Sequence, residues 1–160
     1  MPAPTLTPHD TAHDAAHDAA ARLRAAIGKL SRATRPTAAA TELGLTPTAT
    51  SVLLTVVREG PIGLSQIADA EDLNPTMLSR VVADLGEAGL VARRSDPSDA
   101  RAAIVDATAA GRRLRDRMRR ERTDALNVVL NELPTADRRR LQAALPVLES
   151  LAESLRDRRR

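Results

Sequence analysis

The chain of 160 residues contains no phenylalanine, tryptophan, tyrosine or cysteine. Without aromatic side chains, the core must consist of aliphatic residues and methionine, which favours helices that approach closely through alanine. The absence of cysteine excludes disulfides, thiolate catalysis and cysteine-based zinc sites. All three histidines lie within the first 17 residues, and the seven glycines are scattered rather than gathered in a phosphate-binding loop. The sequence therefore predicts no enzyme, no catalytic residue and no cofactor.

Long apolar runs are missing as well. No run approaches the roughly 20 residues that a membrane helix needs, and residues 1–21 lack the apolar segment of a signal peptide. We therefore expect a cytoplasmic protein that does not associate with a membrane. Hydrophobic residues still make up 42% of the chain, which is enough for the packed core of one domain.

Charge is distributed unevenly along the chain. The net charge is +3, from 24 basic and 21 acidic residues. Residues 46–107 hold five arginines and nine acidic residues, a net charge of −4, whereas residues 108–122 hold seven arginines and two acidic residues, a net charge of +5. If residues 46–107 bind nucleic acid, a few placed arginines must make the contacts, because a broad basic surface is missing there.

Apolar spacing and breaker residues predict a largely helical chain. Residues 1–13 read as a disordered arm, and a helix is expected from Asp14 to about Thr34, followed by a loop. Thr46-Pro47 should start the next helix, Ser65 should cap a short one, and Asn74-Pro75 should cap a third that ends at Gly89.

Two short extended runs, 90–94 and 101–107, flank a segment rich in turn formers and predict a β-hairpin. Thr108 should cap a long helix to about Leu133, and a last helix is expected from about Ala136 to Leu155, with a kink at Pro146. Leucines at 141, 145, 148 and 155 follow the spacing of paired helices, although packing within the chain would also explain them.

This order of elements predicts a mainly α fold with a small β-hairpin wing, that is, a winged helix-turn-helix plus a helical dimerisation region. The expected divisions are the arm (1–13), a first dimerisation helix and loop (14–45), the DNA-binding domain (46–107) and long C-terminal helices for dimerisation (108–160).

The helix that starts at Asn74 is the candidate recognition helix. Leu78, Val81, Val82 and Leu85 fall on one face and should pack inward, while Thr76 and Arg80 fall on the opposite face. An amphipathic surface helix and a solvated turn remain the alternatives for this helix and for the hairpin tip. The candidate DNA-binding residues are Asn74, Thr76, Met77, Ser79 and Arg80 on the helix, and Arg93, Arg94 and Arg101 on the hairpin.

Residues 73–85 (LNPTMLSRVVADL), 89–93 (GLVAR) and 96–101 (DPSDAR), with Thr108 and Gly111, resemble the multiple-antibiotic-resistance regulator (MarR) family. The resemblance implies a homodimer held by its terminal helices. It also implies a palindromic double-stranded DNA operator, with the recognition helix in the major groove and the wing in the minor groove. In one departure, Ala100 stands where the family often has arginine.

The resemblance further implies a small-molecule effector, bound where the first and fifth helices meet the DNA-binding module. The candidate lining residues are Leu23, Ile27, Leu53 and Val57, with Arg112 or Arg113 at the mouth. Separately, His9, His13 and His17 recur every four residues and are weak candidates for a metal or pH-sensing site, against the simpler interpretation of a solvated arm.

These observations predict a sequence-specific transcriptional regulator, most simply a repressor that an effector releases from DNA. The alternative is a winged-helix module that binds only protein.

Overall fold

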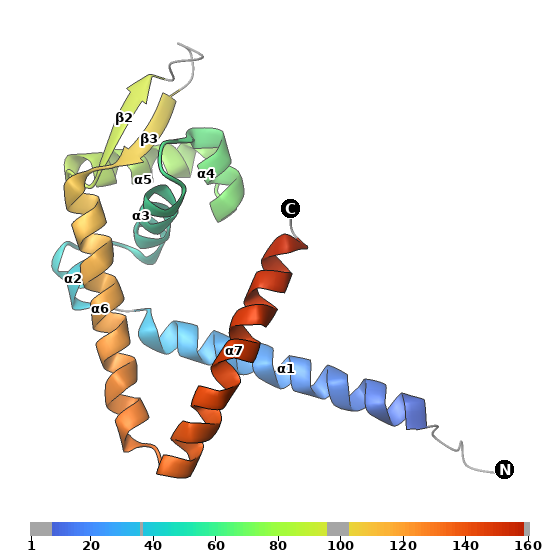
Figure 1. Cartoon of the computed structure of the whole chain (residues 1–160). Coiled ribbons are helices and arrows are strands. Elements are labelled where there is room, and N and C mark those ends of the chain that lie inside the picture. Colours follow the sequence, from blue (N-terminus) through green and yellow to red (C-terminus); the bar gives the residue numbers. More distant parts are fainter. Residues whose placement is uncertain (1–7, 36, 96–102, 159–160) are drawn as a thin grey trace. The chain divides into compact units, whose positions relative to one another are not determined.

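The computed structural model describes residues 8–35, 37–95 and 103–158, with residues 8–16 described as backbone only (Figure 1). These ranges contain α1 (Pro8–Thr34), α2 (Ala38–Glu42), α3 (Pro47–Glu59), β1 (Ile62–Gly63), α4 (Leu64–Glu71), α5 (Pro75–Glu87), β2 (Val91–Ser95), β3 (Ala103–Ala107), α6 (Ala109–Glu132) and α7 (Thr135–Asp157). No helix within them is long and apolar enough to span a membrane.

The chain divides into two compact units, Met1–Arg120 and Glu121–Arg160. The boundary between the two units falls inside α6. The reason is that Leu114 and Met118, in the first half of α6, are buried in the core of the first unit.

Two helices of the first unit, α3 and α5, start where the capping residues predicted. The Thr46 Oγ1 atom accepts a hydrogen bond from the Ala49 N–H at 3.1 Å, and the Asn74 Oδ1 atom accepts one from the Met77 N–H at 2.8 Å. In both helices proline follows the cap, where its missing N–H costs nothing. Gly89 adopts a positive φ of 68° just beyond α5, which confirms it as the residue that ends this helix.

An aliphatic core holds α3, α4, α5, the sheet and the start of α6 together. Leu78, Val82 and Leu85 of α5 are at most 1% exposed, as the helical spacing predicted, and Val81 packs half-buried beside them. Methionine and branched aliphatic side chains fill the space that aromatic residues occupy in other cores. The largest fully buried side chains are those of Val52, Leu53, Val56, Ile67, Leu78, Val82, Leu85, Val105 and Met118.

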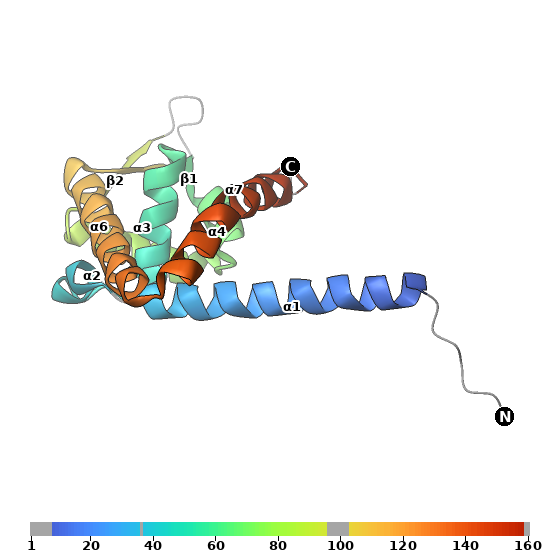
Figure 2. The same ribbon diagram turned by 60° about the horizontal axis from the view of Figure 1, so that its bottom comes forward.

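The hairpin is part of a three-stranded antiparallel sheet with the order β1-β3-β2. Figure 2 labels its two outer strands, β1 and β2. The register of the hairpin pairs Val91 with Ala107 and Arg93 with Val105. The sequence had predicted the hairpin but missed β1, in which Ile62 pairs with Val105. The winged helix-turn-helix fold is confirmed.

Three helix starts differ from the sequence prediction. The helix α1 begins at Pro8 rather than Asp14, so residues 8–13, expected in a disordered arm, are helical; proline is well tolerated in a first turn. The expected loop after it contains α2, capped by Thr37. Finally, α4 begins after Gly63 rather than Ser65, because the Gln66 side chain accepts a hydrogen bond from the Gly63 N–H at 3.1 Å.

The second unit exposes an unusual amount of apolar surface. Every described residue of α7 is at least partly exposed, and the helix continues through Pro146. The exposed large apolar side chains of this unit are Leu126, Val128, Val129, Leu141, Leu145, Val147, Leu151 and Leu155.

Candidate nucleic-acid interface

The turn between α4 and α5 sets the direction of the recognition helix. Asp72 adopts a left-handed conformation with φ of 52°, and the Leu73 N–H donates to the Ala68 carbonyl at 3.0 Å. Aspartate tolerates this conformation better than most residues, because its short polar side chain can form hydrogen bonds with the nearby backbone. The reversed chain then enters α5 at its Asn74 cap, so α4 and α5 form the two helices of a helix-turn-helix.

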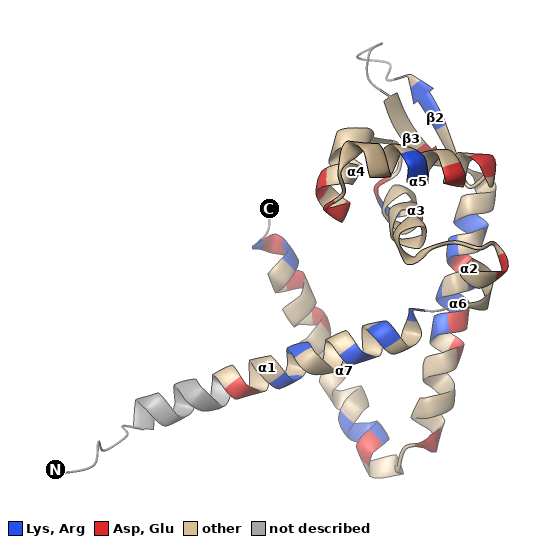
Figure 3. Ribbon diagram, turned by 180° about the vertical axis from the view of Figure 1, so that it is seen from behind, with Lys and Arg blue, Asp and Glu red and all other residues tan. Residues whose placement is uncertain are grey.

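The outer face of α5 carries the residues that the sequence singled out. Thr76, Met77, Ser79 and Arg80 are all exposed, and Met77 is 47% exposed. Arg80 makes no hydrogen bond or ion pair with any residue in the described ranges. Figure 3 shows a basic position, coloured blue, on α5. Asn74 is exposed too, although its Oδ1 atom is engaged in capping the helix.

Consecutive arginines on β2 face opposite sides of the wing. The register puts Arg93 on the side of Val91 and Val105, whose side chains are buried against the core. Arg94 lies on the other side, where Asp106 is its diagonal neighbour across the strands. Arg93 is exposed and has no ion-pair partner among the described residues. The two arginines therefore cannot contact one groove of DNA in the same way.

Asp106 joins the wing to α6. Its Oδ2 atom accepts a hydrogen bond from an Arg94 nitrogen at 3.2 Å, and its Oδ1 atom accepts one from an Arg112 nitrogen at 2.9 Å. Only 12% of the Asp106 side chain is exposed, against 64% for Arg94 and 46% for Arg112. Sequence analysis missed Asp106; the available signal was an acidic residue two positions out of register from an arginine in a predicted hairpin.

A second junction lies at the start of α6. The Thr108 hydroxyl donates to the Gly89 carbonyl at 2.7 Å and accepts from the Gly111 N–H at 3.1 Å, while the Thr108 N–H donates to the Leu90 carbonyl at 3.0 Å. The first turn of α6 is thereby held against the end of α5, and Thr108 is confirmed as the capping residue.

The candidate effector residues differ in burial and in their contacts. Leu53 is completely buried in the core, Val57 is half-buried beside it, and Arg112 is paired with Asp106. Leu23 is half-buried and Ile27 is 55% exposed on α1, and Arg113 is exposed on α6. Their grouping around one ligand stays a prediction.

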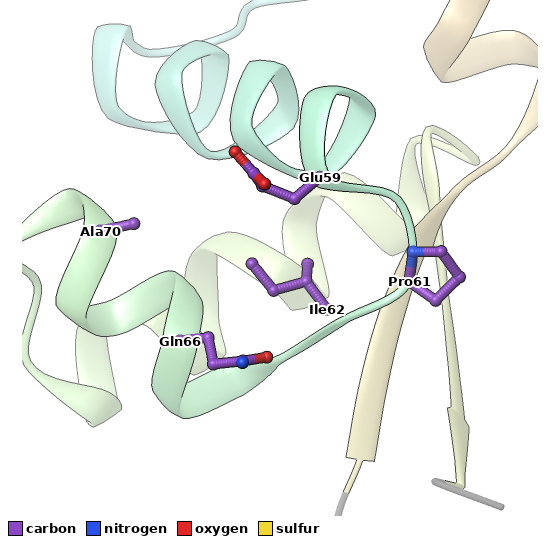
Figure 4. A pocket seen from close by; sticks show the side chains of 5 residues that line it. All are labelled: Glu59, Pro61, Ile62, Gln66 and Ala70. Atoms are coloured by element: carbon purple, nitrogen blue, oxygen red, sulfur yellow. The ribbon is translucent and has the colours of Figure 1, made fainter. Parts of the chain in front are cut away.

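An open pocket of about 380 Å³ lies elsewhere on the first unit (Figure 4). It is lined by Glu59, Pro61, Ile62, Gln66 and Ala70, which come from the end of α3, β1 and α4. None of the candidate DNA-binding or effector residues belongs to it.

Two other predictions depend on residues that the structure does not describe. Arg101 lies outside the described ranges, and the side chains of His9 and His13 do as well. Among the described residues there is no group of three histidine, aspartate or glutamate side chains that could hold a metal ion. The proposed roles of the wing tip and of the histidines therefore stay predictions.

The sequence profile of the MarR family matches residues 45–103. Two HTH-type transcriptional regulators, an uncharacterized one from Mycobacterium bovis and one from Mycobacterium tuberculosis, are each 30% identical to the chain over 103 residues, which is 64% of this chain and 72% of theirs.

Solved structures share the fold at lower sequence identity. A transcriptional regulator from Thermotoga maritima has a TM-score of 0.76 and 18% identity, covering 88% of this chain and 98% of its own. A mutant of S. aureus MepR bound to an oligodeoxyribonucleotide has a TM-score of 0.61 and 18% identity, covering 82% and 96%. With the helix-turn-helix, the wing and the matching relatives in agreement, the chain belongs to the MarR family of transcriptional regulators.

Proposed function

We propose that this regulator is a repressor that binds palindromic double-stranded DNA operators as a homodimer in the cytoplasm and is released by a small-molecule effector. In this proposal α5 enters the major groove and the wing enters the minor groove. Residues 46–107 bind DNA, and residues 14–45 and 108–160 form the dimer.

The outer face of α5 is the observation that carries the proposal. Its first two turns present uncharged side chains together with Arg80, a cation that has no partner among the residues that the structure describes. A surface of this shape can approach base edges closely, and a guanidinium without a partner can bind guanine or phosphate at no cost to the fold.

The DNA-binding roles follow from position. Thr76 and Met77 meet base edges or a thymine methyl group, Arg80 reads guanine or binds phosphate, and Ser79 and Asn74 bind the backbone. On the wing, Arg93 binds phosphate, and Arg94 contributes the N–H groups not engaged with Asp106. Arg101 inserts into the minor groove, where narrow A·T-rich segments concentrate negative potential.

A homodimer accounts for the exposed apolar side chains of α6 and for the exposed leucines of α7 that follow the paired-helix spacing, because large exposed apolar patches mark interfaces. A second copy related by a two-fold axis would present two recognition helices to two half-sites. Operator symmetry follows from that arrangement.

The effector of this proposal is an apolar or aromatic acid, which suits a site of aliphatic side chains (Leu23, Ile27, Val57) with Arg113 at the mouth. Leu53 and Arg112 would join such a site only if the core and the Asp106 pair rearranged. A panel of phenolic acids tests this: binding should raise the melting temperature and release DNA, and a panel with neither effect contradicts effector control.

Genomic footprinting of the purified protein tests the DNA-binding proposal. The expected result is a palindromic motif whose half-sites lie one helical turn, about 10 base pairs, apart. Footprints without a shared motif would contradict sequence-specific binding.

The acidity of residues 46–107 favours a second candidate function, a winged helix that binds only protein. Salt discriminates between the two, because DNA binding through phosphates weakens steeply as salt rises and apolar protein contacts do not.

A further inference from the structure

The outer half of the wing lacks the packing that fixes its base. Val91 on β2 and residues 105–107 on β3 are buried, whereas Arg93, Arg94 and Ser95 are exposed. Hydrophobic contacts and the pairing of β1 with residues 104 and 105 of β3 hold one side of the hairpin, whereas the outer residues of β2 are exposed, so polar contacts contribute to the position of that strand.

The ion pairs of Asp106 supply such contacts. One carboxylate accepts from Arg94 on β2 and from Arg112 on α6, and it is itself almost buried. A carboxylate in this position is costly unless it is paired, so the fold favours the arrangement in which both arginines are engaged. Because Arg94 lies near the outer end of β2, the tie links the exposed part of this strand to the base of β3 and to α6.

We propose that Asp106 is a positioning residue that fixes the direction of the wing relative to the start of α6 and so presents Arg93 to DNA. This inference rests on the proposed DNA-binding function and extends it to a residue that touches no DNA. Because α6 continues toward the exposed apolar side chains around Leu126, the wing would take its direction from a helix of the proposed dimer region.

Two variants of the full-length protein test the tie from either side. Asp106→Asn removes the charge and keeps the shape, and Arg112→Gln removes the partner on α6. Arg120→Gln is the matched control, because Arg120 is an exposed arginine two turns further along the same helix, with no ion pair among the described residues.

Amide hydrogen exchange in the free protein provides the first measurement. Asp106→Asn and Arg112→Gln should each speed exchange in β2 and β3 about tenfold, because opening of the wing becomes easier, while Arg120→Gln leaves it unchanged. Exchange as slow as in the wild type in both variants would overturn the proposal, whatever the result of the DNA-binding measurement.

Titration on a footprinted operator provides the second measurement. Each variant should bind about tenfold more weakly than the wild type, and the double variant should be no weaker than Asp106→Asn alone, because both changes remove the same tie. Additive losses would overturn the proposal. If the wild type itself binds no operator, the proposed function fails, while the exchange measurement still decides whether Asp106 holds the wing.

Discussion

Gly111 illustrates how a single residue determines the junction between the recognition helix and the helix that follows the wing. A Cβ atom placed on Gly111 would overlap with the Leu90 carbonyl oxygen and would lie 3.3 Å from the Leu53 Cδ1 atom. The oxygen is backbone and already accepts the Thr108 N–H, so it has no freedom to withdraw. The absence of a side chain at this position is what lets α6 start against the end of α5.

Gly111→Ala should therefore destabilise the protein by about 1–3 kcal/mol, the usual cost of overpacking a core. Urea unfolding of the purified variant measures this. Gly86→Ala is the control, because its Cβ would meet nothing closer than the Val91 carbonyl oxygen at 4.0 Å. Alanine there should be neutral or stabilise α5 by up to about 1 kcal/mol. Equal stability of the two variants would show that the contact at Gly111 is not tight.

Arg80 is the residue on which sequence preference should depend. Arg80→Ala should cost about 1–3 kcal/mol of operator binding and relax the preference at one position of each half-site. The fold should be unaffected, since the side chain is exposed and unpaired within the described part of the chain. Electrophoretic titration against operator variants measures both effects. Arg58→Ala removes the same charge from an exposed position on α3 and should retain the preference; equal behaviour of both variants would refute base reading by Arg80.

At the scale of elements, α2 is tied to α6 by one bidentate ion pair. The Nη1 and Nη2 atoms of Arg117 donate to the Glu42 carboxylate, at 2.7 and 2.8 Å, and hold the pKa of Glu42 below its ordinary value. This geometry is the strongest that an arginine and a carboxylate can form. It connects residues 75 positions apart in the sequence.

The direction of the pKa shift gives a pH dependence. A carboxylate with a lowered pKa in the folded state stabilises the protein above its ordinary pKa, and this contribution is lost as pH falls through the folded value. Glu42→Gln should therefore flatten the acid side of the stability curve, measured by urea unfolding at a series of pH values. Glu87→Gln, at an exposed position on α5, should leave the curve parallel to that of the wild type. A Glu42→Gln curve parallel to the wild type as well would rule out this contribution.

Elements with several turns were predictable because each repeats its signal. The inward apolar face of α5, its Asn74 cap and Gly89 at its end all indicate the same helix, so the prediction of this helix did not depend on a single weak signal. By contrast, α2 has five residues and β1 has two, too few for a period. Their existence depends on partners distant in sequence, such as Val105 for Ile62.

The sequence predicted only those features of the candidate site that depend on local backbone geometry. Exposure of Thr76 and Arg80 follows from helical spacing, which the sequence contains. The different surroundings of Arg93 and Arg94 do not follow from helical spacing or any other local pattern. They depend on the register of β2 against β3 and on the hydrogen bond that Arg112 of α6 donates to Asp106.

At the scale of the whole molecule, the exposed apolar side chains of α7 argue for a second chain. Leu141, Leu145 and Leu155 of the paired-helix spacing are all more than a third exposed within one chain. Burying apolar surface stabilises an association by roughly 25 cal/mol per Å², so helices with this pattern gain from a partner. Dimerisation would also supply the two-fold symmetry that a palindromic operator requires.

Leu145→Asp should shift the protein toward monomers, measured by light scattering at micromolar concentration, because it places a charge in the proposed seam. Val147→Asp is the matched control: Val147 is 69% exposed on the same helix and lies outside the paired-helix spacing. The control should remain dimeric. A wild-type protein with the mass of one chain would contradict the homodimer directly.

The central claim is that α5 and the wing bind an operator through arginines. Operator affinity measured as a function of salt, for the wild type and Arg93→Gln, tests it most directly. The logarithm of affinity should fall linearly with the logarithm of salt, with a slope of about −0.9 for each phosphate neutralised, and Arg93→Gln should reduce that slope by about one such unit. A salt-independent affinity, or a slope that Arg93→Gln leaves unchanged, would contradict this account of the interface.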